Sequence, residues 1–281
     1  MENMAAIHVK TDEKTTLRKW KILNATTIKL LAAALMLLDH IHQMFVSAGA
    51  PMWLTMAGRS VFPLFLFTAS ESFHYTRSKK KYLQRMFLAS LGMSAFTLIL
   101  QRLVPNHNNV ELMNNAFSTF FVTSIYMLSW DWLTDGIRSR MPKQIVKGIL
   151  LALVPILTTL PFFLSLSLQA NENIPGFVLQ LLGTLTLGIP SIMTIEGGPL
   201  LVVLGLLFYI LRKHRFAQIT ALLLLSTVLY ILSGGIQWMM CFAAIPMALY
   251  NGERGRGMKN FFYIFYPAHI GLLYLLSTFL L

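Results

Sequence analysis

The chain has 281 residues, of which 56% are hydrophobic and only 12% are charged. Its mean hydropathy of +0.62 excludes an ordinary soluble domain, whose surface needs far more charge. Apolar runs long enough to cross a hydrocarbon core, about 17 to 25 residues each, recur along the whole chain and indicate a membrane protein. The formal charge of +12 lies in short segments between these runs, so we expect contact with membrane lipid and no nucleic-acid partner.

The amino-terminal segment is polar and basic. No cleavable signal peptide is expected in residues 1–23, because the following run is too long and too interrupted for a signal-peptide core and no small-residue cleavage site is present. We expect residues 1–23 to be a cytoplasmic basic segment and residues 24–281 to be a single transmembrane domain. The one cysteine, Cys241, excludes an intramolecular disulfide framework and a cysteine-built zinc site.

Helices are the default for these apolar runs, since a segment in lipid must satisfy its own backbone hydrogen bonds. We therefore predict an all-α, polytopic integral membrane helix bundle of about nine to ten transmembrane helices in the plasma or inner membrane. The predicted spans lie near residues 24–47, 53–75, 82–103, 116–135, 148–169, 176–195, 199–211, 216–232, 235–250 and 261–280.

The distribution of basic residues predicts the orientation. Most Lys and Arg residues lie in five short segments, at 10–21, 77–85, 138–147, 212–215 and 254–259, whereas the connections at 48–52, 104–115 and 170–175 contain none. The positive-inside rule therefore places the amino terminus and the basic loops in the cytoplasm.

Ten complete crossings would conflict with this rule, because the basic segments at 212–215 and 254–259 would then lie outside. Residues 188–199, "GIPSIMTIEGGP", carry glycine, proline and Glu196 within an apolar region, a pattern typical of a broken or re-entrant segment. Nine crossings with one irregular segment restore the rule and place the carboxyl terminus outside.

The first span, "IKLLAAALMLLDHIHQMF", carries Lys29 at its start and Asp39, His40 and His42 near its centre. A charged group at mid-bilayer costs at least about 2.5 kcal/mol, so such groups face protein or water. Lys29 precedes His40 by eleven residues, almost three helical turns, which places both on one stripe about 16 Å apart. This spacing suits a long donor molecule with a phosphate end at the cytoplasmic surface. The alternative is that the histidines only hydrogen-bond between helices.

The second span, "GRSVFPLFLFTASESFHYTRSKKKYLQR", predicts a polar pocket, since it carries Arg59 in its outer part and Glu71 in its inner part. Pro63 between them is expected to loosen or bend the helix. Asp39 or Glu71 is a candidate to orient the His40 ring. The basic cluster that follows could hold nucleotide phosphates, or it could only anchor the protein to anionic lipid; it comprises Arg77, Lys79, Lys80, Lys81 and Arg85.

Two later stretches add candidate groups. Glu196 lies beside a glycine pair, where backbone can approach a ligand closely, although it could equally be an exterior loop carboxylate. In "LYNGERGRGMKNFFYIFYPAHIGLLYLL" a turn-rich basic loop precedes Tyr266-Pro267-Ala268-His269. Pro267 leaves the carbonyl of Tyr263 without its helical partner, and we expect His269 or a water to lie near it. The alternative is a histidine that only supports a kink.

Together these stretches resemble the TraX family, membrane proteins named for the conjugative F-pilin acetylase. The resemblance rests on the two spans quoted above, on "EGGPL", and on "ALYNGERG" followed by "FFYIFYPAHIGLLYL". Glu71-Ser72 stands where the family usually has Glu-Gly. The spacing of Lys29 and His40 is also similar to the basic-x10-His pattern of the wider membrane acyltransferase group.

The resemblance implies a membrane acyltransferase that moves an acetyl group from acetyl-CoA to an amine or hydroxyl of a protein N terminus, a glycan or a lipid. A thioester is already activated, so neither metal nor ATP is expected. The catalytic candidates are His40, Asp39 and His269. The acceptor-side or oxyanion candidates are Arg59, Glu71, Glu196 and Tyr266. The candidates for the coenzyme A phosphates are Lys29, Arg77, Lys80 and Arg85. The alternatives are a proton-coupled transporter or lipid flippase, and a noncatalytic assembly partner of a surface apparatus.

Overall fold

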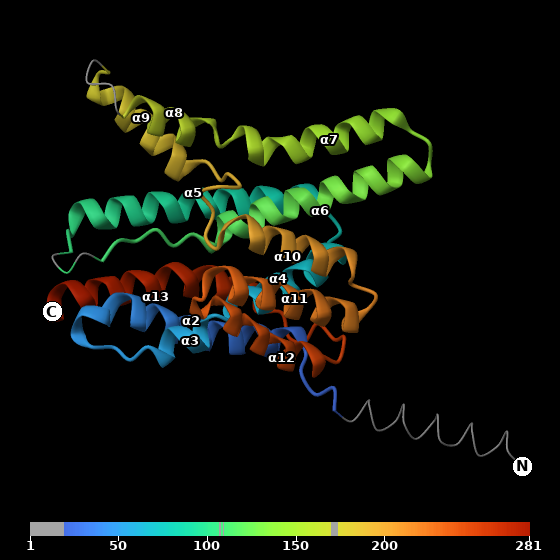
Figure 1. Cartoon of the computed structure of the whole chain (residues 1–281), viewed down its shortest axis with the longest axis horizontal. Coiled ribbons are helices and arrows are strands. Elements are labelled where there is room, and N and C mark those ends of the chain that lie inside the picture. Colours follow the sequence, from blue (N-terminus) through green and yellow to red (C-terminus); the bar gives the residue numbers. More distant parts are fainter. Residues whose placement is uncertain (1–19, 107, 109, 170–173) are drawn as a thin grey trace, which may run out of the picture.

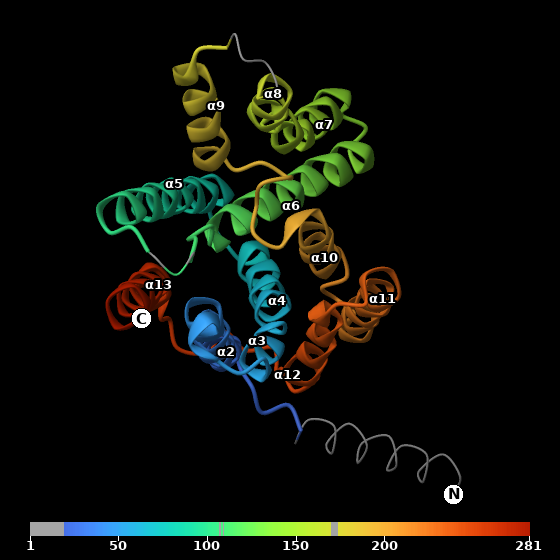
Figure 2. The ribbon, with the colours of Figure 1, turned by 60° about the vertical axis from the view of Figure 1, so that its left-hand side comes forward.

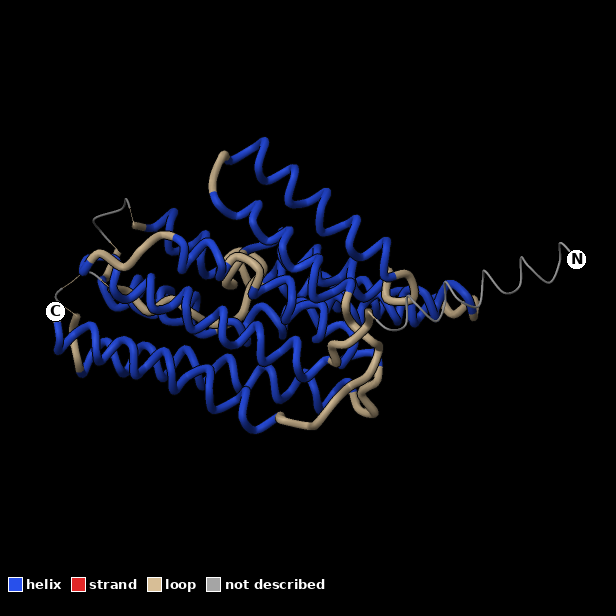
Figure 3. Tube along the Cα trace, turned by 90° about the horizontal axis from the view of Figure 1, so that it is seen from below, coloured by secondary structure: helices blue, strands red, loops and turns tan. Residues whose placement is uncertain are grey.

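A computed structural model describes residues 20–106, 108, 110–169 and 174–281. The described part is built from helices joined by loops and contains no strand (Figure 3), apart from one isolated bridge between Leu23 and Tyr250. Within the residues just given, five helical stretches are long and apolar enough to cross a membrane. The prediction of an all-α polytopic membrane bundle is confirmed, whereas most of the expected basic segment 1–23 lies outside the described residues.

Most helices match the predicted spans, but the spans predicted at 53–75, 148–169 and 235–250 are each divided into two helical pieces. In chain order they are α2 (Ala25–Phe45), the 3-10 turn η1 (Val46–Ala48), α3 (Trp53–Gly58), α4 (Val61–His74), α5 (Lys79–Leu103), α6 (Ala116–Arg138), α7 (Pro142–Leu157), α8 (Leu160–Leu168), α9 (Gly176–Gly188), α10 (Gly198–Ile210), α11 (Arg215–Ser233), the 3-10 helix η2 (Ile236–Ala243), α12 (Ala244–Ala248) and α13 (Lys259–Leu280).

The basic loops share one end of the bundle. The turns α4–α5, α6–α7, α10–α11 and α12–α13 lie at the same end as the start of α2, on the right of Figure 1, and the carboxyl terminus lies at the opposite end. The start of α9 and the end of α10 lie at opposite ends of the bundle, so α9 and α10 together pass along it once. The chain between them is non-helical at 189–197, as expected for the irregular segment.

The second predicted span differs from expectation because it is two helices. α3 ends at Gly58 and α4 begins at Val61, so the break precedes Pro63 instead of lying at it. A proline is tolerated in the first turn of a helix, where its missing N–H would have no partner, but not in the interior. The break places Arg59 on a turn between the two helices.

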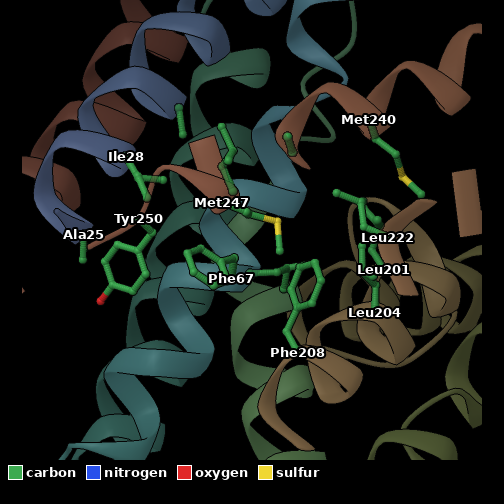
Figure 4. Packing of buried hydrophobic residues seen from close by; sticks show 14 residues of the cluster. Ala25, Ile28, Phe67, Leu201, Leu204, Phe208, Leu222, Met240, Met247 and Tyr250 are labelled. Carbon is green, nitrogen blue, oxygen red and sulfur yellow. The ribbon is translucent and has the colours of Figure 1, made fainter. Parts of the chain in front are cut away.

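Two apolar clusters hold the central helices together. One joins α2, α4, α10, α11, η2 and α12, where Phe67, Phe208 and Tyr250 pack beside Met247 (Figure 4). The other joins α2, α4, α5, α6 and α13 around Met36, Met93 and Ile270. Helices α7, α8 and α9 lie on the far side of α5 and α6 from α2 and α13 (Figure 2), and α8 and α9 bury no residue. We therefore place the functional site among the central helices.

Candidate functional site

A cavity of about 570 Å³ lies among α2, α4, α5, α6 and α13 and reaches the segment at 189–197. At one end its lining includes Lys29 and Arg85, and about three helical turns farther along α2 it includes Asp39 and His40. The stripe predicted from the spacing of Lys29 and His40 therefore faces one continuous space. The loop 250–258 between α12 and α13 also contributes to the lining.

His40 and His269 form a buried histidine pair at the deep end. His40 Nδ1 lies 2.7 Å from His269 Nε2, and the side chains are only 4% and 6% exposed. The rings are tilted by 16° with centroids 4.9 Å apart, so the two nitrogens meet edge to edge in nearly one plane. His269 itself is absent from the cavity lining and lies behind His40.

The hydrogen bonds around this pair assign the protons. His269 Nδ1 lies 2.7 Å from the carbonyl oxygen of Phe265, and a carbonyl only accepts, so Nδ1 of His269 is the donor. In a neutral His269 ring Nε2 is then an acceptor, and His40 Nδ1 donates to it. This arrangement leaves His40 Nε2 as an unprotonated nitrogen, which is the state that a general base requires.

The partner of His269 differs from expectation. Its ring bonds the carbonyl of Phe265, four residues earlier, and not the carbonyl of Tyr263 that Pro267 leaves free. A helical side chain lies over the preceding turn, so a residue four positions back is within reach and one six positions back is not.

A polar network adjoins the unprotonated nitrogen of His40. Asn114 Nδ2 lies 3.4 Å from His40 Nε2 and donates to Gln43 Oε1 at 3.1 Å. The same amide lies 3.5 Å from Glu196 Oε1, and Tyr266 donates to Glu196 Oε2 at 3.0 Å. The network ties α2, α13 and the irregular segment to the chain before α6, so the site depends on parts of the sequence that are far apart.

Asp39 does not contact the His40 ring in this arrangement. Its Oδ1 pairs with Arg59 Nη2 at 2.7 Å and accepts from Thr55 at 2.6 Å. Arg59 also donates to the Thr55 hydroxyl and carbonyl and to the Gln237 side chain. The approach is close because Gly58 faces Asp39, where an added Cβ would lie 2.4 Å from the Asp39 Cβ. Asp39 and Arg59 thus join α2 to the turn before α4.

Glu71 lines the cavity far from His40, near its other end. It pairs with Arg215 Nη2 at 3.5 Å, and the Arg215 guanidinium lies over the rings of Phe67 and Tyr250 at 4.2 and 4.8 Å. Lys29 donates to Ser72 at 3.3 Å. The ring of His40 is therefore oriented by His269, while Glu71 joins α4 to α11.

The basic candidates separate into two groups. Lys29 and Arg85 line the cavity, whereas Arg77 and Lys80 are exposed outside it. Three basic residues that the sequence reasoning did not select, Arg254, Arg256 and Lys259, also line it. The signal in the sequence for this part of the site is the alternation of charge with the glycines at 252, 255 and 257.

Sequence reasoning also missed Asn114 and Gln43. Both residues have amide side chains and neither belongs to a recognised motif. Asn114 also lies in the connection 104–115, which the charge pattern placed on the side of the membrane opposite the cytoplasm. No signal in a single sequence separates such an amide from an ordinary loop residue.

Comparisons with known proteins give a consistent identity. The family model described as TraX protein matches residues 24–168, about half of the chain, including Asp39, His40 and Asn114. The chain is similar to the "Probable fimbrial assembly protein FimC, serogroup H1" of Dichelobacter nodosus, with 29% identity over 258 residues that cover 89% of this chain and 94% of that protein. No solved structure matches. The chain belongs to the TraX family of membrane proteins.

Proposed function

We propose that this protein is a membrane-embedded acyltransferase that moves an acetyl group from acetyl-CoA to an amine or hydroxyl acceptor. The observation that carries the proposal is the cavity itself, which joins a basic opening to a buried histidine with an unprotonated ring nitrogen. The distance along α2 between Lys29 and His40, about 16 Å, is comparable with the length of an extended pantetheine arm. An acyl thioester could thus reach His40 while its phosphates stay at the opening.

His40 acts as the general base in this proposal. Its Nε2 takes the proton of the acceptor nitrogen or oxygen as that atom attacks the thioester carbonyl. The imidazolium formed at His40 then lies beside the developing oxyanion and stabilises it. The tetrahedral intermediate collapses with cleavage of the carbon–sulfur bond, and the thiolate of coenzyme A takes the proton back from His40. The acetyl group ends on the acceptor and no redox step or metal is needed.

His269 and Asp39 support this step without touching the acyl group. His269 holds the His40 ring through a hydrogen bond to Nδ1, which keeps Nε2 free to accept a proton. Asp39 keeps Arg59 paired and so fixes the turn between α3 and α4 against α2. Glu196 and Tyr266 line the deep end, where we place the acceptor.

We also propose which end of the helix bundle faces the cytoplasm. Coenzyme A is a cytoplasmic metabolite, and the basic loops share the end of the bundle at which the cavity opens. We therefore propose that this end faces the cytoplasm of a cell whose plasma or inner membrane holds the protein, with the amino terminus on the same side.

The test uses the full chain in lipid nanodiscs with radiolabelled acetyl-CoA and a set of small primary amines and alcohols as acceptors, following free coenzyme A and labelled acceptor. Wild type is expected to release coenzyme A, and His40→Ala is expected to lose this release by about 10²- to 10⁴-fold, the usual contribution of a general base. His42→Ala is the matched control, because His42 is two residues away and does not line the cavity. Equal release by wild type and folded His40→Ala would refute the proposal.

A second candidate is a noncatalytic partner in assembly of a surface apparatus, which the name of the similar fimbrial assembly protein favours. Such a partner needs no thioester site. Binding and turnover of acetyl-CoA would exclude a purely noncatalytic role. Ion movement that depends on a proton gradient, without acyl transfer, would instead favour the transporter alternative.

A further inference from the structure

We propose that the opening of the cavity is a binding site for a nucleotide with more than one phosphate, formed by the loop between α12 and α13 together with α2 and α5. The inference rests on the proposed function for the identity of the ligand, namely the adenosine bisphosphate end of the acyl donor. It replaces the expected phosphate contacts at Arg77 and Lys80, which lie outside the cavity.

Five basic side chains converge on this opening from three parts of the chain. They are Lys29, Arg85, Arg254, Arg256 and Lys259. The ion pairs found within the described residues join Arg59, Lys79 and Arg215 to carboxylates. The five basic side chains at the opening, which we call the rim, take part in none of these pairs. A rim of cations without carboxylate partners attracts phosphate groups, and guanidinium groups bind phosphate oxygens with two parallel hydrogen bonds.

The loop that supplies the arginines is fixed in place by the start of α2. Ala25 N donates to the carbonyl of Glu253 at 2.8 Å, and Thr26 Oγ1 donates to the carbonyls of Arg254 and Arg256 at 3.0 and 2.7 Å. These bonds hold the backbone of both arginines beside the cavity. The loop is therefore prearranged for binding, and less conformational entropy is lost when a ligand arrives.

The glycine between the arginines is required for this arrangement. Gly255 has a φ of 71°, and an added Cβ would lie 2.3 Å from Asn24 Oδ1. A side chain at this position would be strained and would push the loop away from α2. The alternation of arginine and glycine thus places two guanidinium groups on one short, anchored loop.

An aromatic side chain at the same opening is suited to bind the base of a nucleotide in addition to its phosphates. Tyr75, at the end of α4, lines the cavity and is 77% exposed. An exposed tyrosine beside basic side chains offers a face on which a base can stack. The rim thus combines phosphate contacts and a stacking surface at the opening that leads to His40.

The test measures binding of adenosine 3′,5′-bisphosphate, which has no thioester, to the full chain in phosphatidylcholine nanodiscs. Wild type is expected to bind, and Arg254→Gln and Arg256→Gln are each expected to weaken binding by about tenfold or more, since each removes a charge-assisted contact. Tyr75→Ala is expected to weaken binding as well. Lys80→Gln is the matched control and is expected to bind as wild type does. Unchanged affinity in both arginine variants would overturn the proposal.

The measurement separates this inference from the proposed function. A short acetyl thioester without a nucleotide, N-acetylcysteamine acetyl thioester, should be consumed in a reaction that needs His40 but neither arginine. Binding of the bisphosphate without any acyl release, in the presence of amine and hydroxyl acceptors, would leave the nucleotide site standing and the proposed function refuted. Release from acetyl-CoA that needs His40 and is equal in the arginine variants would refute the nucleotide site alone. A parallel measurement uses nanodiscs that also contain phosphatidylglycerol. If the arginine variants lose bound phosphatidylglycerol there but keep wild-type affinity for the bisphosphate, the basic opening is a lipid headgroup site and the proposal is overturned.

Discussion

The hydrogen bond between His269 and His40 should control the rate of acyl transfer. Replacing His269 by Phe removes the acceptor of His40 Nδ1, which lies 2.7 Å away, in a side chain that is only 4% exposed. A buried donor without a partner costs about 1–3 kcal/mol. If that cost falls on the transition state, kcat decreases about 5- to 150-fold. The KM for acetyl-CoA should change little, because His269 does not line the cavity.

The assay is release of coenzyme A from acetyl-CoA by the protein in nanodiscs, with kcat and KM measured separately. His269→Gln supplies an amide oxygen that can accept from His40 Nδ1, so it should recover part of the rate that His269→Phe loses. A variant at His42 reports any general effect of replacing a membrane histidine. Full activity in His269→Phe, or equal losses in the Phe and Gln variants, would contradict a positioning role for this hydrogen bond.

Three further changes test the packing around the site by thermal unfolding in nanodiscs. Gly58→Ala should destabilise the protein by about 1–3 kcal/mol through overpacking against Asp39. Gly92→Ala is the control: its added Cβ has no neighbour within 4 Å, so it should be neutral or stabilising by up to about 1 kcal/mol. The same shift in melting temperature in both variants would argue against the close contact between Gly58 and Asp39. Asp39→Asn and Arg59→Gln should show a coupling of about 0.5–3 kcal/mol in a double-mutant cycle, and strict additivity would mean that the pair is not formed. Tyr266→Phe removes a hydroxyl that bonds both the start of α6 and the segment at 189–197, so a loss of about 1–3 kcal/mol is expected, and an unchanged melting temperature would speak against this bridge.

The sequence predicted correctly those features that depend only on residues close together in the chain. The apolar runs predicted the all-α membrane bundle, because hydrophobic length reports directly on the solvent around a helix. The spacing of Lys29 and His40 depends only on helical geometry, and both side chains do face one cavity. The glycine, proline and Glu196 of the segment at 188–199 predicted non-helical backbone, which the structure contains at 189–197.

The sequence was less informative wherever contacts join distant segments. His40 pairs with His269, which lies 229 residues farther along the chain. The sequence instead predicted that a nearer carboxylate, Asp39 or Glu71, would orient the ring. Asp39 instead faces Arg59, because adjacent residues on a helix point about 100° apart. Basic residues present a related difficulty, since exposed Lys80 and cavity-lining Arg256 carry the same charge and only the fold distinguishes them.

A cryo-electron microscopy structure of the full chain in nanodiscs with bound acetyl-CoA would show where the acyl donor lies. The proposed mechanism requires the donor to fill the cavity, with the thioester beside His40 Nε2 and the phosphates at Arg254 and Arg256. Donor density elsewhere on the protein, or a thioester held away from His40 in a well-ordered complex, would contradict it.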